Sequence, residues 1–143
     1  MTSFTTRMMV RAAMLVVAAG AASAQTMKAE IPFTFRAGDR VMAAGTYQVT
    51  ELNRQSGPPV FRVADMGGRH AILLMPNALR DTEKGWEAAG KALLAFDCGG
   101  SRCALAAVWR GYPSPAYSFK RQKLGRDEPA RFTMISMRPD KAE

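Results

Sequence analysis

The sequence predicts an all-β fold, a small antiparallel sandwich or barrel of about eight short strands built from hairpins. Short apolar runs alternate with Gly, Pro, Asn and Asp residues along most of the chain, which is the rhythm of many short strands. Two segments have the pattern of β-hairpins around Gly-Gly pairs, at Gly67-Gly68 and Gly99-Gly100. After the first 24 residues, no segment shows the apolar periodicity of a long helix.

The first 24 residues are typical of a cleavable secretory signal peptide. Arg7 and Arg11 form a basic start, an apolar run follows over 12–19, and Ala22-Ser23-Ala24 provides small residues for cleavage before Gln25. The apolar run is shorter than the roughly 20 residues that a membrane-spanning helix needs, so an uncleaved anchor is the less favoured alternative. Cleavage between Ala24 and Gln25 predicts a mature protein in the periplasm or outside the cell.

The chain has 143 residues, with 20 Lys and Arg against 12 Asp and Glu. Two of the basic residues and none of the acidic ones lie in the leader, so the mature segment 25–143 keeps a net charge near +6. This length suits one domain, with its core over roughly residues 28–138. The charge favours an anionic envelope polymer or another envelope protein as partner, and solubility without an acidic partner is the alternative. An exported protein has no access to cytoplasmic nucleic acid, and the mature segment holds no predicted transmembrane span.

Two strands are expected before the first hairpin. Alternate apolar residues of Ile31–Phe35 share one face of an extended segment. The segment 36–40 then turns the chain, and Thr46–Thr50 is a strand rich in β-branched and aromatic residues. A polar loop follows over 53–59.

The first hairpin is expected to join Val60–Asp65 to 70–74 through a two-residue turn at Gly67-Gly68. Such a turn needs positive φ, which glycine adopts without strain. In this register apolar residues meet apolar residues across the strands, so the pattern is self-consistent. The predicted opposite pairs are Met66–Arg69, Asp65–His70, Val63–Ile72 and Phe61–Leu74.

The second hairpin is expected to join Ala92–Cys98 to Cys103–Trp109 through the turn 99–102. An even cysteine count in an exported chain indicates a disulfide between Cys98 and Cys103. Zinc is the weaker alternative, because it takes four ligands and the chain has two cysteines and one histidine. The apolar pattern and the cysteine spacing favour one register. Its opposite pairs are Cys98–Cys103, Phe96–Leu105, Leu94–Ala107 and Ala92–Trp109.

The rest of the chain is expected to hold two more strands. Asn77–Lys91 contains two glycines and no clean apolar stripe, which predicts a loop or at most one helical turn. A short strand is expected over Ala116–Phe119, then a polar connection over 120–131, and a last strand over Arg131–Met137. The pattern does not distinguish a barrel from a sandwich.

The opening of the mature segment resembles an uncharacterised family of small secreted bacterial β proteins. Its pattern is I-P-F-x-F, a G-D/K turn and A-G-x-Y-x-V, matched here by Ile31–Phe35, Gly38-Asp39 and Ala44–Val49. Val108-Trp109 also resembles the end of a later hairpin of the family. This sequence has Ala43 where the family commonly has proline. The resemblance implies an exported β domain and supplies no activity.

His70 and Asp65 are the one candidate catalytic pair. His70 is the only histidine, and the predicted register places it opposite Asp65, as in the acid–histidine pair of a hydrolase. The sequence identifies no nucleophile to complete a triad, so a polar pair beside a turn is the favoured interpretation. We therefore do not expect an enzyme, and we assign no catalytic residue, cofactor or metal site.

Two groups of residues are candidate ligand contacts. A basic stretch could meet an anionic ligand, and its alternative is a solvated connection between strands. An aromatic platform could stack on sugars or bases, and its alternative is core packing. The basic candidates are Lys120, Arg121, Lys123 and Arg126, and the aromatic ones are Trp109, Tyr112 and Tyr117.

The leading expectation is a non-catalytic exported binding module with a basic surface. A structural or protein-interaction domain without a small ligand is the alternative, and a hydrolase-type enzyme that uses His70 and Asp65 is the third. The partner and the oligomeric state do not follow from the sequence.

Overall fold

The computed structural model confirms the all-β class. It describes residues 26–52, 58–83, 85–86, 90–111, 114–121 and 131–140, so the predicted leader lies outside the described residues. None of the described segments forms a helix long and apolar enough to span a membrane. The strands are β1 (Thr26–Ile31), β2 (Phe35–Ala37), β3 (Arg40–Met42), β4 (Gly45–Leu52), β5 (Val60–Asp65), β6 (Ala71–Leu74), β7 (Ala78–Arg80), β8 (Leu93–Gly99), β9 (Arg102–Trp109), β10 (Ala116–Ser118) and β11 (Arg131–Pro139).

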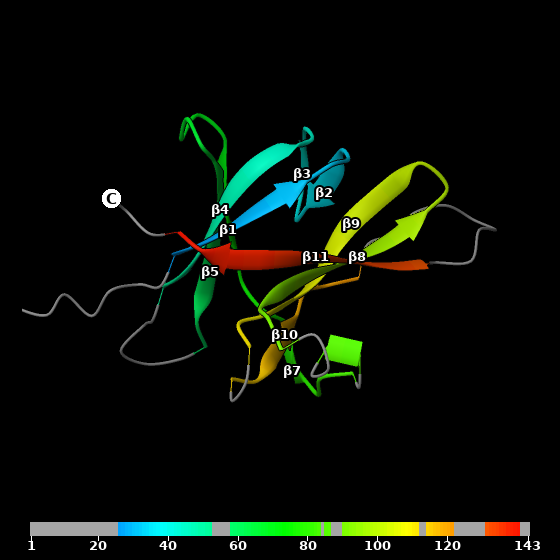
Figure 1. Ribbon diagram of the computed structural model, residues 1–143. Coiled ribbons are helices and arrows are strands. Elements are labelled where there is room, and N and C mark those ends of the chain that lie inside the picture. Colours follow the sequence, from blue (N-terminus) through cyan, green and yellow to red (C-terminus); the bar gives the residue numbers. More distant parts are fainter. Residues whose placement is uncertain are drawn as a thin grey trace, which may run out of the picture.

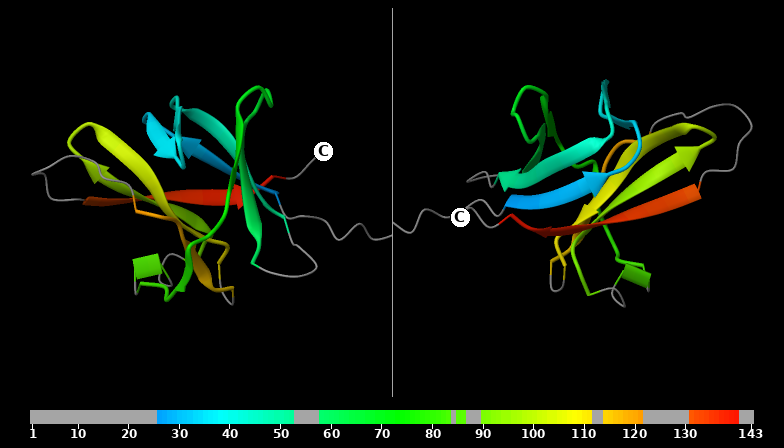
Figure 2. Two further views of the ribbon diagram at one scale, coloured as in Figure 1. Left: turned by 180° about the vertical axis from the view of Figure 1, so that it is seen from behind. Right: turned by 45° about the horizontal axis from the view of Figure 1, so that its top comes forward.

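One continuous path of strands nearly closes into a barrel (Figure 1). Its order is β3-β2-β9-β8-β11-β1-β4-β5-β6, and β10 and β7 branch from β9. The described pairings are antiparallel except the short one between β2 and β9. The C-terminal strand β11 joins the two halves, because it pairs with β1 on one edge and with β8 on the other. Two further views show the strands wrapped around a shared interior (Figure 2).

Two features bring the ends of this path together. β6 pairs with β5, and the chain then continues into β7, which pairs with β10 and so reaches β9. The β2–β3 hairpin covers the gap that is left, where Arg40 Nη1 donates to the carbonyl oxygen of Ala71 at 3.4 Å. Gly38, in the turn of that hairpin, lies against the side chains of Ile72 and Leu74. The barrel is therefore closed partly by strand pairing and partly by side-chain packing.

The interior is filled by alternate residues of the strands. Phe35 lies in it edge-on to Tyr47 and Phe96, with ring centroids 5.2 and 5.4 Å apart. Offset and edge-to-face contacts of this kind are the preferred geometry for aromatic pairs. The other large interior side chains include Ile31, Met42, Val49, Phe61, Val63, Leu94, Leu105, Val108 and Met137.

The first hairpin has the predicted strand register and a different turn. β5 and β6 pair as expected. The Asp65 N–H donates to the His70 carbonyl at 2.9 Å, and the Gly68 N–H donates to the Asp65 carbonyl at 3.0 Å. The loop therefore spans 66–69, and the predicted Met66–Arg69 pair is wrong because both residues belong to it. Of these residues only Gly68 has a positive φ, 69°, whereas the expected two-residue turn needs a positive φ at its first residue, Gly67.

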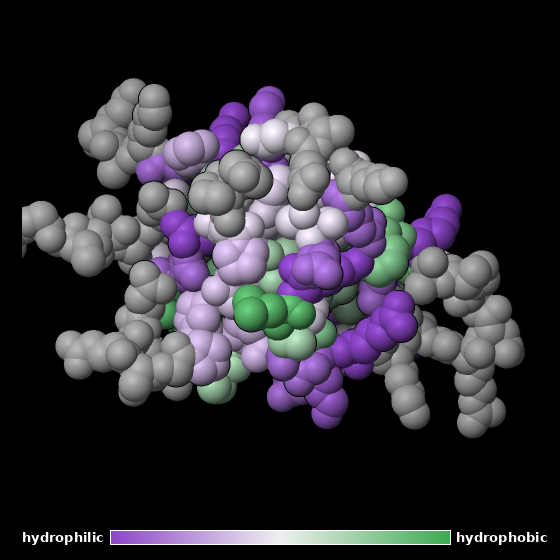
Figure 3. Space-filling model, turned by 90° about the horizontal axis from the view of Figure 1, so that it is seen from below, coloured by the Kyte–Doolittle hydropathy of each residue, from purple (hydrophilic) through white to green (hydrophobic). Residues whose placement is uncertain are grey.

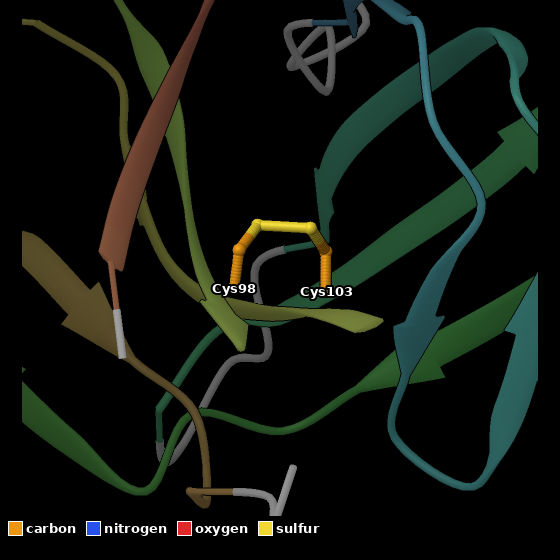
Figure 4. Close-up of a disulfide and its surroundings, with 2 residues drawn as sticks. All are labelled: Cys98 and Cys103. Atoms are coloured by element: carbon orange, nitrogen blue, oxygen red, sulfur yellow. A yellow bond between two sulfur atoms is a disulfide. The ribbon is translucent and has the colours of Figure 1, made fainter. Parts of the chain in front are cut away.

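The second hairpin follows the predicted register only near its turn. The Cys98–Cys103 and Phe96–Leu105 pairs form as expected, and the two sulfur atoms lie at disulfide distance, 2.07 Å (Figure 4). A β-bulge between Ala95 and Phe96 then leaves Ala106 of β9 as an extra residue.

This bulge changes the face that Trp109 occupies. Beyond it Leu94 pairs with Val108 and Leu93 with Trp109, so the predicted pairs Leu94–Ala107 and Ala92–Trp109 are wrong. A one-residue shift exchanges the two faces of a strand. Val108 therefore fills the barrel interior, and Trp109 belongs to a second hydrophobic cluster on the outer face.

Other strand boundaries also differ from the prediction. The expected strand Ile31–Phe35 is interrupted, because β1 ends at Ile31 and β2 begins at Phe35. β3 was not expected, and β7 lies inside the segment predicted as a loop. Both are three-residue strands. β7 pairs with the distant strand β10, whereas β3 pairs with the adjacent β2 in a tight hairpin, where the sequence predicted one longer turn over 36–40.

Candidate functional site

A tryptophan from the loop after β7 covers the outer face of β8, β9 and β10. Trp86 is 1% exposed and packs against Trp109, with ring centroids 6.5 Å apart. Small side chains on this face leave room for the two rings, and Trp109 Nε1 donates to the Ser114 carbonyl at 2.9 Å. The remaining members of this cluster are Leu93, Ala95, Ala107 and Ala116.

Arg80, at the end of β7, lies over this tryptophan cluster. Its guanidinium carbon is 4.9 Å from the centroid of the Trp86 ring and 5.3 Å from that of Phe132. Its Nη2 also donates to Glu83 Oε1 at 2.5 Å. Cation–π contacts and an ion pair therefore hold one guanidinium group in a defined position.

A cleft of about 300 Å³ lies beside Arg80 on the same outer face. This volume is at the lower end of the range for small-molecule sites, roughly 300–1,000 Å³. Viewed from the end that carries β7 and β10, the molecule shows hydrophilic side chains around a small hydrophobic patch (Figure 3). The cleft is lined by Asn77, Arg80, Asp97, Ala106, Ser118, Phe119, Arg121 and Phe132.

Asp97 is a buried carboxylate in this cleft. The residue is 5% exposed, and its Oδ2 lies 3.5 Å from Nε of Arg121, whose side chain is 76% exposed. Its Oδ1 has no hydrogen-bond partner among the described residues. Most buried carboxylate oxygens in proteins have partners, so this one calls for an explanation.

The structure places only part of the predicted basic stretch. Lys120 and Arg121 are exposed after β10, and Arg121 lines the cleft. Lys123 and Arg126 lie outside the described residues. Of the four predicted contacts, Arg121 therefore lies at a cleft. Arg80, which was not among the predicted residues, lines the same cleft.

Two of the three predicted aromatic residues, Trp109 and Tyr117, lie in hydrophobic clusters. Trp109 is 1% exposed beneath Trp86, and the ring of Tyr117 packs against Phe61 at 5.5 Å in the barrel interior. Tyr112 lies outside the described residues. The aromatic residues that line the cleft are Phe119 and Phe132, and the ring of Phe119 also packs against Phe61, with ring centroids 6.0 Å apart.

His70 and Asp65 form a hydrogen bond on the exposed turn between β5 and β6. His70 Nδ1 donates to Asp65 Oδ2 at 3.0 Å, and the backbone N–H groups of Arg69 and His70 donate to Oδ1 at 2.9 and 3.3 Å. The hydrogen bond from the His70 side chain is the main cause that lowers the pKa of Asp65, with the backbone N–H groups acting in the same direction. The imidazole is 73% exposed, which fits a polar pair that stabilises a turn.

A second cleft, of about 290 Å³, lies between β2 and the disulfide-closed hairpin. Two arginines line it, Arg36 and Arg102, together with Thr34 and Ser101. No carboxylate is among its lining residues, which distinguishes it from the cleft at Asp97. Within the described part of the chain, no group of three His, Cys, Asp or Glu residues is placed to hold a metal ion.

Sequence features could have pointed to the residues that were missed. Asp97 is the single charged residue in the apolar run 92–98, and Trp86 is the one aromatic residue in the polar segment Asn77–Lys91. Comparison of the chain with family models, curated proteins and solved structures finds no match in any of the three.

Proposed function

We propose that this protein is a non-catalytic, exported binding module that takes an anionic group in the cleft between Arg80 and Arg121. One observation carries the proposal: Arg80 and Arg121 both line a single cleft, together with the polar residues Asn77 and Ser118. Guanidinium groups bind carboxylate and phosphate through charge-assisted hydrogen bonds, which are stronger than neutral ones.

The two arginines would contribute differently to binding. Arg80 is held by Glu83 and two aromatic rings, so it would present its charge with little loss of side-chain entropy. Arg121 is mostly exposed and would be free to reorient towards a ligand. The net positive charge of the chain would raise the local concentration of anions around both.

Export rests on the predicted signal peptide. The described strands start at Thr26, one residue after the expected mature N-terminus at Gln25. Cleavage there would leave the whole sheet intact, which supports a mature module in the periplasm or outside the cell. Carboxylate or phosphate groups of an envelope polymer are then the anions within its reach.

Arg121→Gln tests the anionic site. N-acetylleucine and inorganic phosphate are the probes, titrated at low and moderate salt by calorimetry and followed by thermal unfolding. We expect the variant to weaken binding by about tenfold, because one charge-assisted hydrogen bond contributes roughly 1.5–3 kcal/mol. Binding by the unmodified protein should also weaken as salt screens the charges.

Arg69→Gln is the matched control, because Arg69 is exposed on the β5–β6 turn, away from β7 and β10 (Figure 1). It removes the same charge and should leave both affinities unchanged. The proposal is wrong if neither probe binds at low salt, or if both variants lose the same affinity.

A protein-interaction domain is the second candidate, because large apolar side chains are exposed where β6 passes into β7. Leu73, Met75 and Leu79 are 60%, 58% and 68% exposed. Apolar side chains that gather on a surface are typical of protein contacts. Sedimentation that depends on protein concentration, with no response to either probe, would favour this function.

A further inference from the structure

We infer that the ligand of the Arg80–Arg121 cleft also carries an ammonium group, which Asp97 binds, so the cleft takes a small zwitterion of the α-amino acid class. This inference rests on the proposed anionic site and goes beyond it. The observation that carries it is the juxtaposition, within one cleft, of a buried carboxylate oxygen without a partner and an exposed guanidinium group.

Asp97 is the part of the cleft that a simple anion leaves unexplained. A carboxylate buried to 5% exposure loses most of its hydration, and this loss is offset only when hydrogen bonds replace the water. Oδ1 has no such bond among the described residues. An ammonium group carries three donors and a positive charge, so it satisfies both needs of this oxygen.

Arg121 only partly meets that need. Its Nε lies 3.5 Å from Asp97 Oδ2, longer than the roughly 2.7–3.2 Å of a normal N–H···O hydrogen bond. The side chain is 76% exposed, so a change of rotamer costs little packing. Oδ1 has almost no exposed surface, so a ligand reaches it only when a neighbouring group moves aside. We infer that Arg121 is that group, because it contacts the other oxygen of the same carboxylate and is mostly exposed. The displaced guanidinium group can then bind the ligand's carboxylate.

The balance of charge in the cleft selects a zwitterion. Arg80 is paired with Glu83, which leaves the loose pair of Asp97 and Arg121. A simple anion that draws Arg121 away leaves Asp97 buried without a counter-charge. A simple cation that binds Asp97 leaves the guanidinium group of Arg121 without its carboxylate partner. A molecule with both charges replaces one loose contact by two close ones. Phe132, which is 46% exposed, lines the cleft as well and favours an apolar side chain on the ligand.

The experiment compares leucine with two relatives that each lack one charge. N-acetylleucine has no ammonium group and leucinamide has no carboxylate. We expect leucine to bind at least about tenfold more tightly than either, because each lost contact is a charge-assisted hydrogen bond. Dissociation constants come from calorimetry or from NMR shifts at matched ionic strength.

Asp97→Asn removes the charge and keeps the shape of the side chain. It should abolish the preference for leucine over N-acetylleucine and leave N-acetylleucine bound at least as tightly as before. Asp39→Asn, on the exposed turn between β2 and β3, makes the same change of charge and should leave the preference unchanged. Thermal unfolding reports whether each variant folds.

Arg121→Gln gives a second test that leaves the buried carboxylate in place. It should weaken leucine and N-acetylleucine and leave leucinamide bound at least as tightly as before, because Arg121 no longer competes for Asp97. Equal affinities for leucine and N-acetylleucine in the unmodified protein would overturn the zwitterion and leave the anionic site standing. Binding of leucinamide without binding of N-acetylleucine or phosphate would instead overturn the anionic site, and the zwitterion with it.

Discussion

Asp65 and Asp97 each lie two residues before a Gly-Gly pair, yet their carboxylates have different surroundings. Asp65 accepts three hydrogen bonds on an exposed turn, all from residues within five positions of it. Asp97 is buried on the outer face of β8, opposite Phe132 of β11. The sequence predicted the Asp65–His70 contact because it is local. It could not predict the environment of Asp97, which depends on a strand far along the chain.

We expect His70→Ala to raise the pKa of Asp65, because the His70 side chain is the main cause that lowers it. A carboxyl group with a lowered pKa in the folded state contributes stability that is present above its unfolded pKa and lost as pH falls through its folded pKa. The variant should therefore lose this contribution at a less acidic pH. A carboxyl NMR titration measures the shift, with Asp39 as an internal reference. An unchanged midpoint for Asp65 would show that the backbone N–H groups alone lower its pKa.

At the scale of elements, the local hairpins were predictable and the bulge in β9 was not. The alternation of apolar residues and the cysteine spacing were enough to predict the strand register next to each turn. Beyond the bulge, Ala106 and Ala107 are both small and apolar, so either residue could face either side of the sheet without a visible conflict in the pattern. The observed choice lets Trp109 pack against Trp86 on the outer face, a contact that the local pattern does not show.

Trp86→Ala tests how far that loop stabilises the fold. We expect a loss of about 3 kcal/mol in the free energy of unfolding, because a fully buried tryptophan is removed and the cavity cannot collapse completely. Trp109 becomes the only tryptophan, and its fluorescence should shift to longer wavelength as water reaches it. Leu79→Ala, at a position that is 68% exposed, is the control and should change neither quantity. An unshifted emission would mean that Trp109 is shielded without Trp86.

At the scale of the whole molecule, closure into a barrel depends on pairings that are distant in sequence. β11 lies between β1 and β8, and β9 lies beside β2, so strands from both ends of the chain pair with strands from its middle. The alternating pattern of each strand is the same in a sandwich and in a barrel. This is why the sequence predicted an all-β domain without distinguishing the two.

Two glycines measure how much the packing between the β2–β3 hairpin and β6 contributes to closure. Gly38 and Gly68 have φ values of 57° and 69°, so alanine is strained at both, by about 1–2 kcal/mol. A Cβ at Gly38 would lie 3.1 Å from a Leu74 methyl carbon and 3.2 Å from one of Ile72, whereas a Cβ at Gly68 would meet no atom within 4 Å.

Gly38→Ala should therefore destabilise the fold by at least about 1 kcal/mol more than Gly68→Ala, since it adds crowding to the same backbone strain. Unfolding in urea measures both, and the two variants share any effect of alanine on the unfolded chain. The extra loss should appear as faster amide exchange in β6, which the hairpin covers. Equal losses would mean that Ile72 and Leu74 move aside freely, and that strand pairing through β7 and β10 closes the barrel without help from the hairpin.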